Sequence, residues 1–151
     1  ERVRRVNPSC DVQALVKRYD PSDDEFIPSL HADFIIDAID DVPAKVAMAV
    51  CCWKHKIPEI SSMGTGNRLH PEMLEIADIY KTRECHLARK MRKALKEARV
   101  RHLPVVYSRE PAHKIIGEGY QPGSISFVPP VSGMLMAGYV IREILKKKGI
   151  E

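Results

Sequence analysis

The stretch Asp33-Phe-Ile-Ile-Asp-Ala-Ile-Asp-Asp-Val-Pro-Ala-Lys45 decides the fold of this 151-residue chain. It opens with a short apolar run between acidic residues, which is typical of a buried strand in a parallel sheet. A helical pattern follows over Val42–His55, with Asp41 as its expected N-cap and Pro43 in its first turn. We therefore expect a strand over residues 33–40 whose carboxyl end leads directly into a helix.

Further segments extend this alternation of strands and helices. Apolar periodicity predicts strands over residues 11–19, 59–62, 103–108 and 124–128, and helices over residues 85–101 and 131–148. Residues 72–80 fit either a strand or a helix. Residues 109–121 show no firm periodicity, which indicates a loop of a length that is usually functional or mobile. The order strand, helix, strand is that of a right-handed crossover unit, so we expect an α/β fold with a mostly parallel sheet.

The composition suits one globular domain over residues 1–151, because 44% of the residues are hydrophobic. The most apolar stretch, Val128 to Leu145, is interrupted by prolines, glycines and an arginine, so we expect no membrane span, and residues 1–10 lack the apolar core of a signal peptide. The four cysteines form no C-x-x-C pair, which argues against structural zinc and favours a reducing, cytoplasmic setting. Cys51, Cys52 and Trp53 are expected in the core.

The net charge of +4 is unevenly distributed along the chain. Basic residues crowd into one segment, which contains Arg83, Arg89, Lys90, Arg92, Lys93, Lys96, Arg99 and Arg101. Such a segment is typical either of a face that binds a polyanion or of an ordinary solvated helix face. The sequence alone does not separate these two interpretations.

Carboxylates gather at the end of the strand over residues 33–40. Ligands of open α/β sheets bind beyond the carboxyl ends of the strands, and carboxylates there commonly hold a magnesium ion that bridges phosphates. Asp37, Asp40 and Asp41 are therefore candidate ligand residues. The alternative is that Asp41 only caps the next helix and that Asp40 lies in a solvated loop. A glycine-containing turn, Met63 to Asn67, would let a ligand approach the backbone, although a single G-x-G is a weak signal.

Taken together, these motifs resemble the ThiF/MoeB/HesA superfamily of ubiquitin-activating-enzyme-like proteins, and within it the tRNA threonylcarbamoyladenosine dehydratases. Residues 33–45 are similar to the pattern D-x-x-I-D-A-I-D-x-V-x-x-K of that branch, where MoeB-type proteins have D-C-T-D-N. The other similar segments are Glu1–Pro8, Lys56–Pro58, Ser61–Asn67, Ala77–Thr82, Val106–Ser108 and Gly123–Phe127. The resemblance implies a three-layer, Rossmann-like α/β fold. The chain would form the second half of a mostly parallel sheet, with an antiparallel strand over residues 73–80.

The resemblance also implies roles for individual residues. Asp40 would bind magnesium and orient the triphosphate of ATP, and Lys45 would balance the local charge, so these two are the expected catalytic residues. The expected nucleotide-binding residues are Asp37, Ala38, Ile39, Asp41, Ser62, Met63, Gly64, Thr65, Gly66 and Asn67. ATP and Mg²⁺ are the implied cofactors.

The implied reaction is ATP-dependent adenylation, in which a carboxylate attacks the α-phosphorus, pyrophosphate leaves and a nucleophile captures the acyl-adenylate. In the dehydratase branch this carboxylate belongs to the threonyl group on tRNA, so tRNA is the implied partner and the segment 83–101 is a candidate phosphate-contacting face. The family's glycine-rich phosphate loop lies before the segment that resembles Glu1–Pro8. We therefore expect this chain alone to be inactive.

Two other functions remain open. An adenylyltransferase for a ubiquitin-like sulfur-carrier protein, of MoeB or ThiF type, is the nearest rival, and the lack of paired C-x-x-C zinc ligands counts against it. Cys85, which precedes the basic helix, is either structural or a nucleophile. A non-catalytic module for dimerisation or RNA binding is the third function.

Two features of assembly also follow from the resemblance. It implies a homodimer formed through the later helices. We further expect another segment or chain to cover the outer edge of the strand over residues 33–40, because an unpaired strand edge is a liability.

Overall fold

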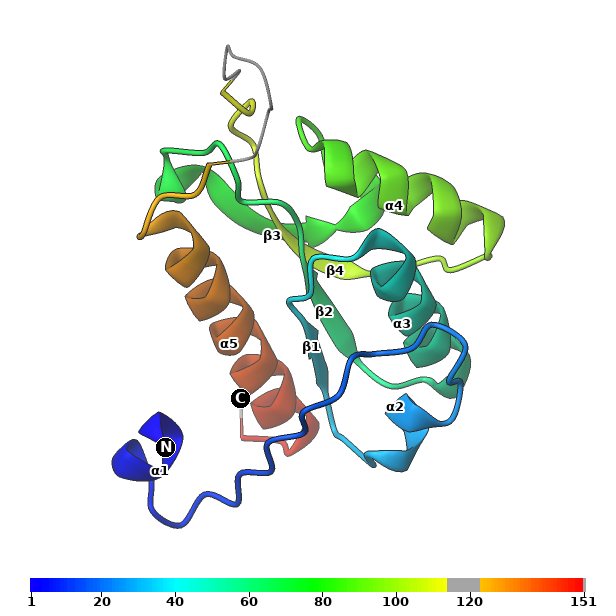
Figure 1. Ribbon diagram of the computed structural model, residues 1–151, viewed down its shortest axis with the longest axis vertical. Helices are drawn as coiled ribbons and strands as arrows, with labels where there is room; N and C mark the ends of the chain where they lie inside the picture. The colour runs from blue at the N-terminus through cyan, green and yellow to red at the C-terminus, as the bar shows by residue number, and fades with distance from the viewer. Residues whose placement is uncertain (114–122, 151) are drawn as a thin grey trace.

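A four-stranded sheet with helices on both faces organises the computed structural model, which describes residues 1–113 and 123–150 (Figure 1). Its strands are β1 (Ile35–Asp37), β2 (Glu59–Ser62), β3 (Leu74–Asp78) and β4 (Pro104–Ser108). They lie in the order β1-β2-β4-β3, with β1 parallel to β2, β2 parallel to β4, and β3 antiparallel to β4. The predicted mostly parallel sheet with an antiparallel extension is thus confirmed.

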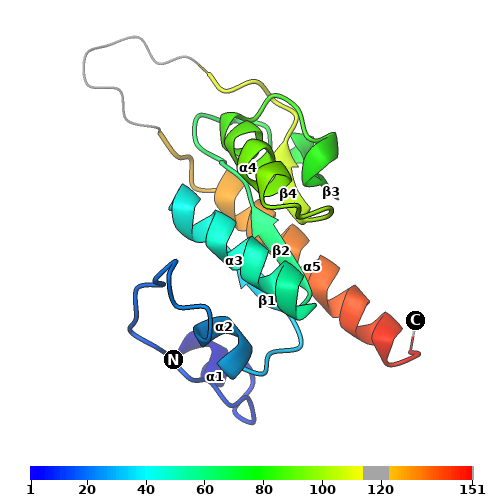
Figure 2. The same ribbon diagram turned by 90° about the vertical axis from the view of Figure 1, so that its right-hand side faces the viewer.

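The helices of the described residues are α1 (Arg2–Val6), α2 (Phe26–Ser29), α3 (Val42–His55), α4 (His86–Glu97) and α5 (Val128–Lys147), with short 3-10 turns at η1 (Pro71–Met73) and η2 (Ile79–Lys81). The helices α3, α4 and α5 form the outer layers of the molecule, whereas the short α1 has no buried residue. Figures 1 and 2 show α3 and α4 on one face of the sheet and α5 on the other. This is the three-layer, Rossmann-like arrangement that the motifs predicted.

Two apolar cores lie on opposite faces of the sheet, because successive side chains of a strand point to opposite sides. Val105 and Tyr107 of β4 join the core under α3 and α4. Val106, between them, joins Ile60 and Met136 in the core under α5. Cys51 and Cys52 are buried as predicted, in a third cluster where α2 packs on α3.

The helix α3 begins and ends where its sequence predicts. Asp41 Oδ1 accepts a hydrogen bond from the Ala44 N–H at 3.0 Å, so Asp41 is the N-cap. Lys56 ends the helix in the left-handed region with φ of 56°. Because β1 ends only a few residues before Asp41, this cap fixes the loop between β1 and α3.

Two predicted strands are absent from the structure. Residues 11–19 alternate apolar and polar side chains but form no regular element, and Val16 is fully exposed. A strand exists only where a neighbour pairs with its backbone, and no described segment pairs with this one. Residues 124–127 are also irregular, and Val128 begins α5 instead of ending a strand. Pro129 and Pro130 are tolerated in its first turn, where a backbone N–H has no intrahelical partner.

Two further expectations concern single positions. Trp53 was expected in the core, but it is 41% exposed, because the last turn of α3 extends past the amino ends of the strands. The greater part of the loop predicted over residues 109–121 lies outside the described residues.

The outer edge of β1 is one of the two edges of the sheet, and the outer edge of β3 is the other. No strand within residues 1–113 or 123–150 pairs with the outer edge of β1, and Ile36 on this strand is 47% exposed. We expected another segment or chain to cover the edge of β1, and that expectation stays a prediction.

In the part of the chain that the structure describes, no helix combines the length and the apolar character needed to cross a membrane.

Candidate nucleotide site

A pocket of about 630 Å³ opens at the carboxyl ends of β1 and β2. Its lining contains most of the residues that the motifs selected, namely Ala38, Ile39 and Asp40 after β1 and Ser62, Met63, Gly64, Thr65 and Gly66 after β2. The first turn of α5 and the start of α4 complete its walls. Two loops that are distant in sequence therefore face one shared space, because parallel strands end at the same edge of a sheet.

Asp37 and Lys45 form a buried ion pair beside this pocket, with both side chains fully buried. Asp37 Oδ2 lies 2.9 Å from Lys45 Nζ and accepts a hydrogen bond from Ser61 Oγ at 2.6 Å. Asp37 Oδ1 accepts from the Ile39 N–H at 3.2 Å, and Lys45 Nζ donates to the Ile39 carbonyl at 3.2 Å. The pair thus holds both backbone groups of Ile39 and shapes the loop that carries Asp40.

Asp40 and Asp41 have different environments although they are neighbours. Asp40 is exposed, and its carboxylate has no hydrogen-bond or ion-pair partner among the described residues. Asp41 is committed to the cap of α3 and to an ion pair at 3.2 Å with the exposed Arg18. Of the predicted acidic residues, only Asp40 therefore presents a free carboxylate to the pocket.

The loop after β2 forms the other wall. The Met63 N–H donates to the Val106 carbonyl at 2.8 Å, which continues the ladder one residue past β2. Nothing lies within 4 Å of the position that a Cβ of Gly64 would occupy, so the backbone there faces open space. Ser62 Oγ lies 3.1 Å from Ser132 Oγ and links this loop to α5. Asn67, with φ of 55°, pairs with the backbone of Gly123 in both directions.

Arg68 lines the pocket too, and the sequence analysis missed it. Only 4% of Arg68 is exposed, and its Nη2 donates to the Glu84 carbonyl at 2.9 Å. Its Nε and Nη1 are buried without a hydrogen-bond partner in the described part of the chain. The signal available in the sequence was weak, because an arginine after a glycine-containing turn is usually exposed.

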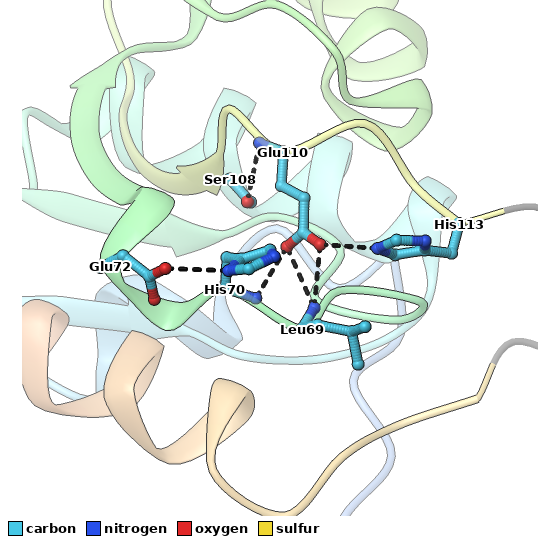
Figure 3. A network of polar contacts seen from close by, with 6 residues as sticks. All are labelled: Leu69, His70, Glu72, Ser108, Glu110 and His113. Atoms are coloured by element: carbon cyan, nitrogen blue, oxygen red, sulfur yellow. Dashed lines mark hydrogen bonds and ion pairs between the residues drawn. The ribbon is translucent and has the colours of Figure 1, made fainter.

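A buried carboxylate, Glu110, ties the pocket loop to the segment after β4 (Figure 3). Its oxygens accept from the Leu69 and His70 N–H groups at 3.0 Å and lie 3.0 Å from His113 Nε2. Burial would raise the pKa of Glu110, but the hydrogen bonds from the His70 and Leu69 backbone outweigh burial and lower it. The sequence analysis also missed this residue, since its partners are backbone groups about 40 positions away.

The side chains at this pocket could bind a magnesium ion in only one mode. Within the described residues, no group of three or more His, Cys, Asp or Glu side chains is placed to hold a metal. Magnesium, however, is often bound through one carboxylate together with waters and substrate phosphates. The free carboxylate of Asp40 matches that mode.

Comparison with known proteins identifies the relatives of this chain. The model of the ThiF family matches residues 1–151. A tRNA threonylcarbamoyladenosine dehydratase of Bacillus subtilis (strain 168) is 34% identical over 161 residues, which cover 96% of this chain and 63% of that protein. The Haemophilus influenzae protein of the same description is 27% identical over 169 residues, covering 98% of this chain and 64% of that protein. The chain thus spans less than two thirds of the length of these relatives.

Solved structures of the Escherichia coli dehydratase have the same fold. Its complex with AMP superimposes with a TM-score of 0.88 at 25% identity, covering 99% of this chain and 63% of that one. Its complex with ATP gives a TM-score of 0.85 at 25% identity, with 98% and 62% covered.

Proposed function

The chain belongs to the ThiF family, and from this premise we propose that it supplies one part of an ATP-dependent adenylating site that dehydrates threonylcarbamoyladenosine in tRNA. The observation that carries the proposal is the free carboxylate of Asp40, held at the rim of a pocket whose other wall is the loop after β2. The relatives described as dehydratases, and the ATP and AMP complexes of one of them, support the choice of nucleotide and substrate.

The chemistry we propose has two steps. A carboxylate oxygen of the threonyl group attacks the α-phosphorus of ATP, and pyrophosphate leaves. A nucleophile of the same modified nucleoside then attacks the acyl carbon, AMP leaves with the carboxylate oxygen, and a proton is released. The sum is the loss of one water from the nucleoside, and no enzyme nucleophile is needed. Cys85 accordingly has a structural role as the cap of α4, where its Sγ accepts from the Ala88 N–H at 3.5 Å.

The residues of the pocket act on this reaction by position and charge. Asp40 would hold a magnesium ion, which when bound would neutralise phosphate charge. Lys45 and Asp37 act through Asp40, because they fix the loop that carries it. The open backbone at Gly64 leaves room for the nucleotide or the substrate to lie against the loop.

The exposed basic side chains of the segment 83–101, which contains α4, are the proposed contact for tRNA. Arg83, Arg89, Lys90, Lys93, Lys96, Arg99 and Arg101 are all exposed, and none of them forms an ion pair with a described residue. Arg92 differs, since its Nη1 donates to the Thr82 carbonyl at 2.9 Å. Cations without acidic partners are available for phosphates, which supports a polyanion-binding face over a merely solvated one.

Other parts of the proposal concern the complete protein. We infer that adenylation needs a region beyond this chain, in which the phosphate loop lies, and that a strand of that region pairs with the open edge of β1. We also propose a cytoplasmic homodimer, with α5 as a contact because Met134 and Ile141 are exposed on it. Sulfur-transfer proteins and ubiquitin-like proteins would be partners only in the rival function, the adenylation of a sulfur-carrier protein.

ATP–pyrophosphate exchange with different acceptors tests this function. The protein that contains this chain together with its preceding region is assayed with tRNA that carries threonylcarbamoyladenosine, with unmodified tRNA, and with a ubiquitin-like protein that ends in Gly-Gly. We expect exchange with the modified tRNA alone. Exchange that depends on the Gly-Gly protein would instead establish the sulfur-carrier activity, and no exchange with any acceptor would overturn adenylation.

A further inference from the structure

A second pocket lies at the opposite end of the sheet from the nucleotide site. It has a volume of about 570 Å³ and opens at the amino ends of β1, β2 and β4, between the last turns of α3 and α5. This volume lies within the range of about 300–1,000 Å³ that is usual for small-molecule sites. None of the residues assigned to adenylation lines it.

Glu59, the first residue of β2, is the polar group of this second pocket. Only 6% of Glu59 is exposed, and its Oε1 is buried without a hydrogen-bond partner in the described part of the chain. Leaving a buried polar atom without a hydrogen-bond partner is unfavourable, so Oε1 marks a place where a ligand group would be favourable.

The groups around Glu59 keep its carboxyl group neutral. Burial, followed by the charge of Asp37, raises the pKa of Glu59 to about 8, against the lowering effects of the Cys52 thiol and of Lys45. At neutral pH the group is therefore mostly protonated. A protonated carboxyl presents one O–H donor beside one carbonyl acceptor, which is a different recognition element from a carboxylate.

The walls of the second pocket are aromatic and aliphatic. Phe34, Trp53 and Tyr139 line it together with Ile57 and Leu103. The rings of Phe34 and Tyr139 meet edge to face, with centroids 6.1 Å apart. Such walls favour a flat, uncharged ligand, because an ion would lose its hydration there.

Charged groups at the rim add a second constraint. Lys56, His102 and Lys147 line the pocket together with Glu143. The excess of basic groups disfavours a cationic ligand. The class of ligand that remains is a neutral ring system whose edge carries a hydrogen-bond donor and a hydrogen-bond acceptor side by side.

We propose that the second pocket is a binding site for a small, flat heteroaromatic compound with a cyclic amide edge, whose N–H and C=O pair with the Glu59 carboxyl. The pairing satisfies the orphaned Oε1 with the ligand N–H and gives the carboxyl O–H a carbonyl acceptor. The ring packs against the aromatic side chains that line the pocket. This site is independent of adenylation and does not rest on the proposed function.

The test uses 2-quinolone, a flat bicyclic cyclic amide, and the 151-residue chain. Trp53 is the only tryptophan in the sequence and lines the pocket, so its indole N–H signal in a ¹H–¹⁵N NMR spectrum reports binding directly. We expect a saturable shift of this signal at pH 7.2. N-methyl-2-quinolone, which lacks the donor, should bind about tenfold more weakly or worse.

Two variants and a pH change separate Glu59 from general apolar binding. Glu59→Leu should weaken 2-quinolone binding about tenfold, whereas Glu59→Gln keeps a donor and an acceptor and should bind within about threefold of the original. At pH 9.5 the original chain should bind about tenfold more weakly, because the carboxylate lacks a donor, and Glu59→Gln should not change. Burial raises the pKa values of the Cys52 thiol beside this carboxyl and of the Tyr139 hydroxyl in the pocket wall, and the charges of Asp37 and Lys45 also act on Glu59.

The exposed substitution Glu72→Gln serves as the matched control and should leave binding unchanged. If Glu59→Leu does not fold, the N-methyl compound and the pH series with Glu59→Gln decide the outcome. Absence of a saturable Trp53 shift up to millimolar 2-quinolone would overturn the proposal. So would equal binding of the N-methyl compound, or a loss of binding at pH 9.5 that persists in Glu59→Gln.

Discussion

The buried pair of Lys45 and Asp37 is the contact on which the loop after β1 depends. Replacing Lys45 by Met would leave the Asp37 carboxylate buried without its cation, so we expect a loss of about 3–5 kcal/mol in the free energy of unfolding. Urea denaturation measures this loss. The matched control is Lys54→Met, an exposed residue of the same helix, which should change stability by less than about 0.5 kcal/mol. Equal effects of the two changes would contradict the assigned role.

Glu110 makes the stability of the folded chain depend on pH in the acidic range. Its pKa is lowered in the folded chain, so the stabilisation is present above the ordinary carboxyl value of 4.5 and is lost as the pH falls through the folded pKa. Glu110→Gln should cost about 1–3 kcal/mol at pH 7 and should flatten the acid limb of a plot of stability against pH. Thermal melts from pH 3 to pH 7 provide that plot. An acid limb of unchanged slope would be inconsistent with this network.

Glu59 makes stability depend on pH in the opposite direction to Glu110. Because its pKa is raised from 4.5 to about 8, the folded chain binds more protons than the unfolded chain between these values, and stability falls as the pH rises through this window. Glu59→Gln should remove this fall and exceed the original chain in stability at pH 9 by an amount on the order of 5 kcal/mol. Denaturation at pH 5, 7 and 9 measures the difference. If the difference in stability between Glu59→Gln and the original chain does not widen as the pH rises, Glu59 is ionised in the folded chain over this whole pH range.

At the scale of elements, the basic face of α4 carries a prediction about binding. Lys90→Glu combined with Lys93→Glu should weaken tRNA binding at least tenfold and lower the dependence of the affinity on salt, because phosphate contacts release counterions. Filter binding at several salt concentrations gives both quantities. The same change of charge on α5, Lys146→Glu with Lys147→Glu, is the control. If both pairs weaken binding equally, the effect is one of net charge and α4 is not the tRNA-binding face.

The elements also show what the sequence could and could not predict. The bounds of α3 followed from local signals, namely the Asp41 cap and the apolar period, and they agree with the structure. Residues 11–19 and 124–128 carried an equally clear alternation but form no strand, because pairing depends on neighbours that periodicity does not reveal.

The same reasoning explains which site residues were found. Asp40 and Gly64 belong to local motifs, and the structure places both at one pocket. Arg68, Glu59 and Glu110 matter because of burial and of partners far away in sequence. No local pattern marks those properties.

At the scale of the whole molecule, the two ends of one sheet have different chemistry. The carboxyl ends of β1 and β2 present a free carboxylate and open backbone, where we propose that a magnesium ion and the nucleotide bind. The amino ends present a buried Glu59 among aromatic rings. The outer edge of β1 lacks a strand partner among the described residues, which is the side where we expect the rest of the adenylating site.

The measurement that tests the central claim most directly is ATP–pyrophosphate exchange by an Asp40→Asn variant of the protein that contains this chain and its preceding region. The control is Asp33→Asn, an exposed carboxylate at the other end of β1. We predict that Asp40→Asn lowers exchange about 100-fold or more, because charge stabilisation at the phosphates is lost, while Asp33→Asn stays within about twofold of the original. Exchange that survives in Asp40→Asn as it does in Asp33→Asn would contradict the account.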